Sequence, residues 1–213
     1  YGWSQEELKQ RLGITPNTPL LALLPGSRRS ELAIHTGLLA KAYIKIKEQL
    51  PELEAVTTRA PGVSDQQLIP LLDAGVQVLD RLEDDYALRA DAAIAVSGTA
   101  TLELALWNVP TVLVYKSSAF TIWLARKLVG TTCAGLANIL LDDKPVMPEL
   151  IQEQATLDVM LKEILPLLNK ESAAMQQQAS FDNLRQRLGD KNPSEAVANM
   201  ALHLVNKKDA CHK

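Results

Sequence analysis

Two short glycine-containing turns carry the residues of this sequence that could do chemistry. The first, Pro25-Gly26-Ser27-Arg28, follows the apolar run Leu20–Leu24 and precedes a long helical pattern. A strand, a glycine turn and a helix N-terminus in this order form an anion site, because free backbone amides and the positive end of the helix dipole converge there. Arg28 would add a fixed positive charge, so the turn predicts a phosphate site. The alternative is that Gly26 only permits the turn and that the arginines are solvated.

The second turn, Ser97-Gly98-Thr99, follows another apolar run, Ala92–Val96, and continues into Ala100 and Thr101. Its hydroxyl groups can cap a helix and donate to phosphate oxygens, and Gly98 allows a ligand to approach the backbone closely. Glu103, one turn into the predicted helix, could accept hydrogen bonds from both hydroxyls of a ribose. The alternative for Glu103 is a favourable interaction with the helix dipole.

Short apolar runs alternate with helical periods along most of the chain, which predicts an α/β fold with a mainly parallel, Rossmann-like sheet and flanking helices. The predicted strands are 20–24, 53–57, 76–79, 92–96 and 111–115. The predicted helices begin with one capped by Ser4 and Glu7 and continue with 31–49, 64–72, 120–129, 157–168, 172–188 and 194–205, the last three forming a C-terminal helical tail. Since the carboxyl ends of parallel strands share one edge of a sheet, both glycine turns should face one crevice.

Composition and charge exclude several classes of protein. With 213 residues, 47% of them hydrophobic, 22% charged and a formal net charge of −3, the chain is globular and has no basic run that would favour nucleic acid as a partner. Cys133 and Cys211 lack the spacing of a zinc or redox site, so no metal or cofactor is predicted and reduced thiols in a cytoplasmic protein are expected. No apolar run could span a bilayer, and a chain that begins with Tyr1 suggests a piece of something longer.

Further segments extend the pattern of the two turns. The sequence has Leu23-Leu24 before the first turn and Glu31 after it, the run 97–103, Pro110, Val114-Tyr115-Lys116, Leu124-Ala125-Arg126, Asn138-Ile139-Leu140 and Pro148-Glu149-Leu150-Ile151-Gln152. In this order and spacing the segments resemble the C-terminal half of the lipid-A-disaccharide synthase family. The chain departs from the family pattern in two places: Ala137 precedes Asn138 where a proline is usual, and Leu141-Asp142-Asp143 replaces a small Ala-Gly turn.

The resemblance implies the donor-binding half of a GT-B glycosyltransferase, with residues 1–165 forming the nucleotide-sugar domain and 166–213 a tail that packs on this domain or on a partner. Such enzymes transfer 2,3-diacylglucosamine from its UDP derivative to the lipid acceptor 2,3-diacylglucosamine 1-phosphate, with inversion and without a metal. By similarity we assign the diphosphate to Gly26, Ser27, Arg28, Ser97, Gly98, Thr99 and Ala100, with Arg28 stabilising the leaving group. The ribose is assigned to Glu103. Further candidates for contact with the UDP-sugar are Thr101, Asn138, Glu149 and Gln152. Alternatives for the last three are a turn residue at Asn138 and a helix start after Pro148.

The resemblance also places the acceptor site and the general base in an N-terminal domain outside this chain, so the isolated chain should have little transferase activity. It implies a cytoplasmic location with peripheral contact at the inner membrane face. The helix predicted at 120–129 could dock on a membrane or pack on the sheet, and the helix at 194–205 could pair two copies in a homodimer. His35 is interpreted as a structural residue rather than a base.

Two other functions remain open. One is another GT-B enzyme that uses UDP-N-acetylglucosamine, such as a peptidoglycan-precursor transferase or a UDP-sugar 2-epimerase. These enzymes typically have a histidine where Val96-Ser97-Gly98 stands here. The other is a non-catalytic module that binds a nucleotide-sugar and completes a site only with another chain. Neither turn is a Walker loop or a G-x-G-x-x-G fingerprint, so ATP hydrolysis and hydride transfer have no motif behind them.

Overall fold

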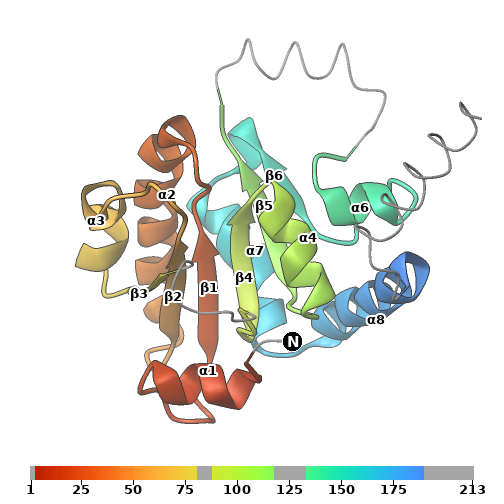
Figure 1. The fold of residues 1–213 in the computed structure, drawn as a ribbon, viewed down its shortest axis with the longest axis horizontal. Coiled ribbons are helices and arrows are strands. Elements are labelled where there is room, and N and C mark those ends of the chain that lie inside the picture. Colours follow the sequence, from red (N-terminus) through yellow and green to blue (C-terminus); the bar gives the residue numbers. More distant parts are fainter. Residues whose placement is uncertain (1–2, 81–87, 118–132, 190–213) are drawn as a thin grey trace, which may run out of the picture.

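Six parallel strands form one sheet in the computed structural model, which describes residues 3–80, 88–117 and 133–189. The order across the sheet is β3-β2-β1-β4-β5-β6 (Figure 1). The strands are β1 (Leu20–Leu24), β2 (Glu54–Arg59), β3 (Gln77–Asp80), β4 (Ala92–Val96), β5 (Thr111–Tyr115) and β6 (Glu149–Ile151). This order is that of the dinucleotide-binding folds and reverses between β1 and β4. The predicted parallel α/β fold is confirmed.

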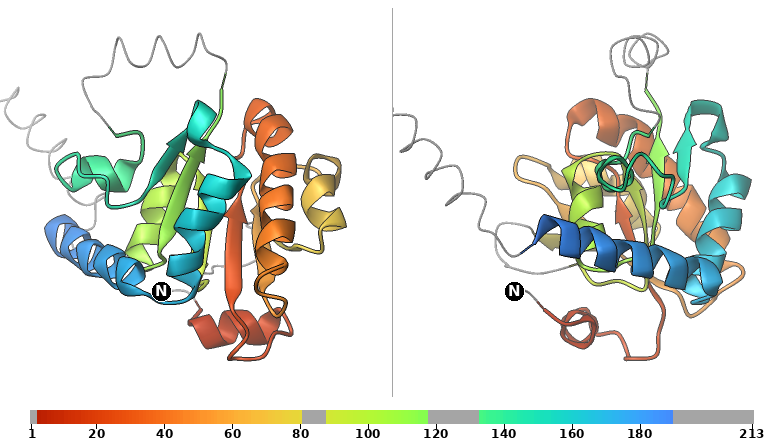
Figure 2. Two further views of the ribbon diagram at one scale, coloured as in Figure 1. Left: turned by 180° about the vertical axis from the view of Figure 1, so that it is seen from behind. Right: turned by 90° about the vertical axis from the view of Figure 1, so that its right-hand side faces the viewer.

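Helices cover both faces of the sheet (Figure 2). They are α1 (Gln5–Arg11), α2 (Arg29–Lys47), α3 (Asp65–Asp73), α4 (Thr99–Leu106), α6 (Leu136–Leu140), α7 (Leu157–Leu168) and α8 (Ser172–Leu188), with a 3₁₀ turn at Gln152–Gln154. Successive residues of β1 point to opposite faces: Leu21 and Leu23 pack in a core with α2, α3 and α7, whereas Leu20 and Ala22 pack with α1 and α4. Burial on both faces explains why β1 and β4 consist of apolar residues alone.

Helix caps account for several of the predicted boundaries. The amide of Ser4 donates to Glu7 Oε2 at 2.7 Å and the amide of Glu7 donates to Ser4 Oγ at 3.2 Å, which is the predicted capping box at the start of α1. The amide of Ser64 donates to Gln67 Oε1 at 3.0 Å before α3. The strands 20–24, 92–96 and 111–115 and the helices 157–168 and 172–188 have the predicted bounds, and the other predicted elements that the structure describes differ by one or two residues.

Two segments differ from the sequence-based reading. The alternative interpretation that a helix begins after Pro148 is wrong. Glu149–Ile151 forms edge strand β6, in which Leu150 is paired with Val114 of β5. Asn138 lies in the short helix α6 rather than in a turn. The predicted helices at 120–129 and 194–205 lie outside the described residues, so their membrane and dimer roles stay predictions. The proposed boundary at 165 falls within α7, and α8 packs back on α4, α6 and α7.

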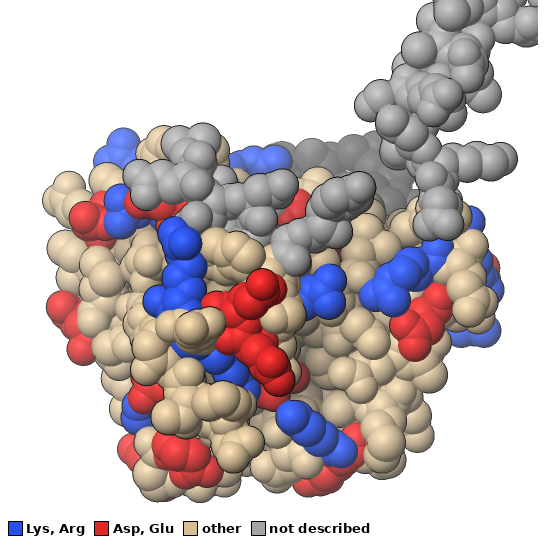
Figure 3. Space-filling model, turned by 60° about the horizontal axis from the view of Figure 1, so that its bottom comes forward, with Lys and Arg blue, Asp and Glu red and all other residues tan. Residues whose placement is uncertain are grey.

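Acidic and basic side chains are both exposed at the end of the molecule where α1 lies (Figure 3). Acidic side chains gather near the middle of this face and basic ones surround them. Within α1 the acidic residues Glu6 and Glu7 occupy the first turn, while Lys9 and Arg11 occupy the last turn. This order complements the helix dipole. In the described part of the chain, no helix is long and apolar enough to cross a membrane.

Candidate functional site

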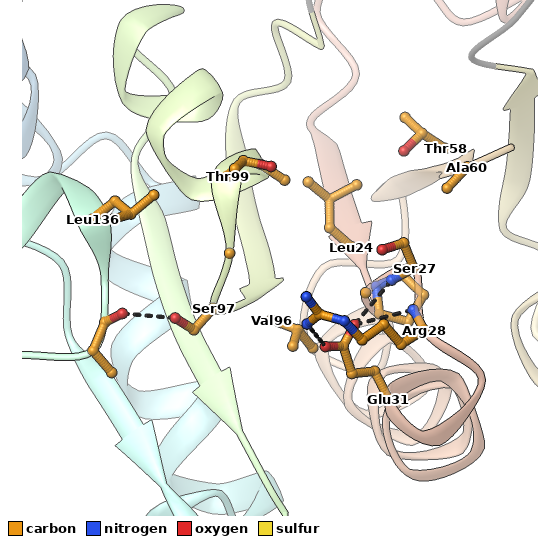
Figure 4. Close-up of a pocket in the computed structure, with 15 residues that line it drawn as sticks. Leu24, Ser27, Arg28, Glu31, Thr58, Ala60, Val96, Ser97, Thr99 and Leu136 are labelled. Atoms are coloured by element: carbon orange, nitrogen blue, oxygen red, sulfur yellow. Dashed lines mark hydrogen bonds and ion pairs between the residues drawn. The ribbon is translucent and has the colours of Figure 1, made fainter. Parts of the chain in front are cut away.

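A pocket lies beyond the carboxyl ends of β1 and β4, where the strand order reverses. Its volume is about 430 Å³, which falls in the range of small-molecule sites. Both predicted turns line it, through Gly26, Ser27, Arg28, Ser97, Gly98, Thr99 and Ala100 (Figure 4). The predicted common crevice is therefore confirmed, and it occupies the usual ligand position of an open parallel sheet.

The second turn presents an open helix N-terminus to this pocket. Thr99 and Ala100 are the first two residues of α4, and their amides have no hydrogen-bond acceptor among the residues that the structure describes. The hydroxyl of Thr101 turns back to the carbonyl oxygen of Gly98 at 2.7 Å, so this side chain does not cover the amides. A Cβ atom placed on Gly98 would meet nothing within 4 Å. The amides and the helix dipole are thus accessible to an anion.

The first turn differs because a side chain of the protein already occupies its amides. Glu31, in the first turn of α2, accepts hydrogen bonds at Oε2 from the amides of Ser27 (3.1 Å) and Arg28 (3.2 Å). Its other oxygen, Oε1, accepts from the Arg28 guanidinium at 2.8 Å. Gly26 has φ +96°, and a Cβ atom there would lie 2.5 Å from Glu31 Oε2. Gly26 is therefore required both for its backbone conformation and for the approach of the carboxylate.

The surroundings of Glu31 favour its ionised form. Burial by itself would raise the pKa of Glu31. Hydrogen bonds from the Arg28 amide and guanidinium and from the Ser27 amide outweigh this effect and hold the pKa below its usual value. The carboxylate thus carries a full negative charge at neutral pH, at the position where a phosphate would meet the N-terminus of α2.

The far wall of the pocket is the segment that contains Ala134 and Leu136. Ser97 Oγ donates to the carbonyl oxygen of Ala134 at 2.8 Å, which joins this wall to the second turn. Glu149 binds the same segment from behind, since Oε2 accepts from the Ala134 amide at 2.8 Å and Oε1 from the Gly135 amide at 2.9 Å. Edge strand β6 therefore places a carboxylate that fixes the pocket wall.

Asn138 belongs to the same network. Its Nδ2 donates to Glu149 Oε1 at 2.8 Å and to the carbonyl oxygen of Met147 at 2.9 Å, and its Oδ1 accepts from the Met147 amide at 2.9 Å. The Asn138 side chain is fully buried and does not line the pocket. These contacts give Asn138 and Glu149 a role in the shape of the pocket wall.

Three more of the predicted site residues do not line the pocket. Thr101 is buried beneath the second turn, and Glu103 lies half-buried farther along α4. Gln152, at φ +55°, pairs with the backbone of Ser117: Oε1 accepts from the Ser117 amide at 3.1 Å and Nε2 donates to the Ser117 carbonyl oxygen at 2.8 Å. Their contacts with a ligand stay predictions.

Several residues that line the pocket were not predicted as site residues from the sequence, namely Glu31, Thr58, Ala60, Ala134 and Leu136. The sequence did contain a signal for Glu31. A glutamate at the third position of a helix forms one half of a capping box, in which its side chain binds the backbone at the N-cap. The other half was absent, since Arg28 occupies the cap position. Ala134 and Leu136 carry no local signal, since only the sheet brings them to the two turns. Among the described residues, no group of three or more His, Cys, Asp or Glu side chains could hold a metal ion.

His35 lies under the carboxyl end of β5 and is fully buried. Its Nε2 lies 3.0 Å from the amide of Lys116, which can only donate, so Nε2 is the acceptor. Nδ1 then carries the proton and donates to the carbonyl oxygen of Glu31 at 2.8 Å. Both ring nitrogens therefore form hydrogen bonds with the backbone, which supports a structural role for His35.

Acid should destabilise the protein through His35. Burial lowers the pKa of His35 below its usual value, so the unfolded chain takes up the proton first as the pH falls. The stability that neutral His35 contributes is present above about pH 6.5, the unfolded value, and is lost as the pH falls toward the folded pKa. Urea unfolding at pH 7.5 and 5.5 should show the loss. His35→Gln, which keeps an acceptor without titrating, should show a smaller pH dependence, and equal pH dependence in both proteins would contradict the assignment.

Comparison with known proteins agrees with this geometry. The sequence profile of a family described as lipid-A-disaccharide synthetase matches residues 3–202. The chain belongs to this family. It is 31% identical over 202 residues to the lipid-A-disaccharide synthase of Coxiella burnetii (strain Dugway 5J108-111), with 95% of this chain and 54% of the relative covered. It is 33% identical over 208 residues to that of Geobacter sulfurreducens, with 96% and 54% covered. The chain therefore spans about half the length of the curated relatives it matches.

Solved structures show the same fold at low sequence identity. WaaG, a glycosyltransferase involved in lipopolysaccharide biosynthesis, matches with a TM-score of 0.53 and 16% identity, over 90% of this chain and 49% of that one. A UDP-N-acetylglucosamine 2-epimerase described as putative, from Listeria monocytogenes, matches with a TM-score of 0.53 and 13% identity, over 84% and 43%. These likenesses concern the fold alone. They confirm the expected Rossmann-like half of a GT-B architecture.

Proposed function

We propose that this chain is the donor-binding half of a glycosyltransferase that makes lipid A disaccharide. The reaction transfers 2,3-diacylglucosamine from its UDP derivative to 2,3-diacylglucosamine 1-phosphate, with inversion at the anomeric carbon and release of UDP. Family membership supports the reaction. The observation that carries the role of this chain is the pocket between β1 and β4, where an open helix N-terminus and an exposed arginine face the same space.

The chemistry of the leaving group fits these residues. As the glycosidic bond to UDP breaks, negative charge grows on the β-phosphate, and preorganised donors that point at this charge lower the barrier. We assign the diphosphate to the amides of Thr99 and Ala100 at the α4 dipole, with Arg28 across the pocket. Ser27 and Ser97 supply hydroxyl groups beside it. A charge-stabilising set of this kind can act without a metal ion.

The remainder of the donor extends beyond the two turns. Glu103 stays our candidate for the ribose hydroxyls, which requires the nucleoside to lie along α4 past the lining residues. Asn138 and Glu149 are proposed to act through the wall at Ala134 and Leu136. Gln152 would act through Ser117, at the carboxyl end of β5.

The other half of the enzyme would supply the lipid acceptor site and the general base. We therefore expect the 213-residue chain to bind UDP but to show little or no turnover. Membrane contact through 120–129 and homodimer formation through 194–205 belong to the same proposal. Vesicle co-sedimentation and a solution mass measurement test these two points, and a chain that stays unbound and monomeric would remove them.

Calorimetric titration tests the nucleotide assignment. UDP should bind at least about 10-fold more tightly than uridine, because charge-assisted hydrogen bonds to the diphosphate exist only for UDP. Raising the salt concentration should weaken UDP binding more than uridine binding. Equal affinities for UDP and uridine would contradict a phosphate site between the turns, and no binding at millimolar UDP would contradict the proposed function as a whole.

A further inference from the structure

The carboxylate of Glu31 stands where the first turn would otherwise hold an anion. It takes the amides of Ser27 and Arg28, and it contacts the Arg28 guanidinium with its second oxygen (Figure 4). Its side chain is 13% exposed, whereas that of Arg28 is 80% exposed. A phosphate that entered the first turn would have to displace a charged group held by three hydrogen bonds. The two turns that line the pocket are therefore not equivalent.

We infer that Glu31 is a positioning residue for the donor diphosphate: it occupies the amides of the first turn and thereby fixes the guanidinium of Arg28 over the pocket. The inference rests on the proposed function. The first turn then meets phosphate through the Arg28 side chain and not through its backbone, while the second turn meets it through the amides of Thr99 and Ala100. Glu31 touches no ligand and acts through Arg28.

The physical reason is preorganisation. An arginine side chain that is mostly in solvent samples many rotamers, and holding it in one geometry costs conformational entropy on binding. One oxygen of Glu31 anchors the guanidinium in the free protein, so part of this entropy is lost before the ligand arrives. The planar guanidinium has five N–H groups, so it keeps donors for a phosphate while it remains on Glu31. Gly26 makes the arrangement possible, because a side chain there would collide with the carboxylate.

A double-mutant cycle of Glu31→Gln and Arg28→Ala, read by titration with UDP and with uridine, tests the inference. Glutamine keeps the size of the side chain but brings an NH₂ group toward the guanidinium. Glu31→Gln alone should weaken UDP binding roughly 5- to 10-fold and leave uridine binding unchanged. The substitution has two possible effects on UDP binding. Removal of the negative charge would strengthen binding whether or not Arg28 is present, whereas release of the guanidinium from Glu31 weakens binding only where Arg28 is present. In the Arg28→Ala background, Glu31→Gln should therefore cause no further weakening.

Each other outcome has a distinct meaning. Tighter UDP binding by Glu31→Gln in both backgrounds would make Glu31 a competitor of phosphate and overturn the inference. Equal weakening of UDP and uridine binding would make the role of Glu31 purely structural and would overturn the inference too.

A second variant and a control complete the experiment. Glu31→Asp keeps the charge but shortens the side chain, and is used if Glu31→Gln does not fold. It should weaken the binding of UDP but not that of uridine. Arg29→Ala, an exposed neighbour that does not line the pocket, should match the parent chain. If the parent chain fails to bind UDP, the proposed function falls together with the inference.

Discussion

Asp91→Asn should lower the free energy of unfolding by about 3–5 kcal/mol, the usual loss when one partner of a buried ion pair is removed. The Asp91 side chain is 3% exposed. One oxygen, Oδ2, accepts from the Leu20 amide at 2.9 Å and lies 2.9 Å from the Lys9 ammonium; the other, Oδ1, lies 3.1 Å from that of Lys170. The substitution would leave the Lys9 ammonium, itself 5% exposed, with the carbonyl oxygen of Pro16 but without its counter-charge.

Urea unfolding of the variant measures this loss, and two controls make it specific. Asp182→Asn removes a half-exposed pair with Arg185 on α8 and should change the stability by no more than about 0.5 kcal/mol. Lys9→Met combined with Asp91→Asn removes both buried charges, so the double variant should be more stable than Asp91→Asn alone. A loss below about 1 kcal/mol for Asp91→Asn would show that this cluster does not anchor α1 to the sheet.

The low pKa of Asp91 should also make the stability of the folded protein sensitive to strong acid. Burial alone would raise the pKa of Asp91, but the bonds from Lys9, the Leu20 amide and Lys170 outweigh burial and hold it below the usual value. A carboxylate with a depressed folded pKa contributes stability above its unfolded pKa of about 3.9, and this stability is lost as the pH falls through the folded pKa. The acid limb of the stability curve should therefore flatten in Asp91→Asn.

Gly98→Val should reduce UDP affinity at least about 100-fold while the protein stays folded. A Cβ atom at Gly98 meets no atom within 4 Å, and the backbone is extended at φ 164°, so a residue with a Cβ atom fits this position without a clash at that atom and without backbone strain. It would instead fill the space in front of the α4 amides, which is where we place the diphosphate. A valine at the cap position costs the helix about 1 kcal/mol or less relative to glycine.

Binding and stability measured on the same variants separate this steric block from unfolding. Gly98→Ala adds one methyl group and should weaken UDP less than Gly98→Val does. Gly62→Ala is the comparison for a glycine substitution outside the pocket, at a position with φ +82°. It should lower stability through backbone strain but leave UDP affinity unchanged. A Gly98→Val protein that binds UDP as the parent does would place the phosphates elsewhere.

Local patterns in the sequence were enough to predict most of the sheet. The runs 20–24 and 92–96 are buried on both faces, so they stand out as unbroken apolar segments, and the strand 111–115 has the buried apolar centre Val112-Leu113-Val114. Strand β6 escaped prediction because it has three residues at the edge of the sheet, of which Glu149 is charged and follows a proline. Such a stretch resembles a helix N-terminus until its pairing with β5 is known.

The site could be predicted in part for the same reason. The two turns directly follow buried strands, so their meeting at one crevice follows from topology alone. The amides of the first turn are occupied and those of the second turn are open, and this difference could not be predicted. It depends on whether the Glu31 side chain turns back to bind the amides of Ser27 and Arg28. The partners of Asn138 and Glu149 were also hidden, since backbone groups of segments 134–135 and 147 reach them only in the folded chain. Sequence motifs identify residues near a site but do not tell which of them touch the ligand.

A titration of the ¹⁵N-labelled chain with UDP, followed at each backbone amide, tests the central claim most directly. The account predicts that the amides of Thr99 and Ala100 shift most, because they gain charged acceptors that they lack in the free protein. The amides of Ser27 and Arg28 should shift less, since Glu31 already holds them. Uridine should leave all four nearly unmoved. UDP that binds without shifting Thr99 and Ala100, or that shifts Ser27 and Arg28 most, would contradict the placement of the diphosphate at the N-terminus of α4.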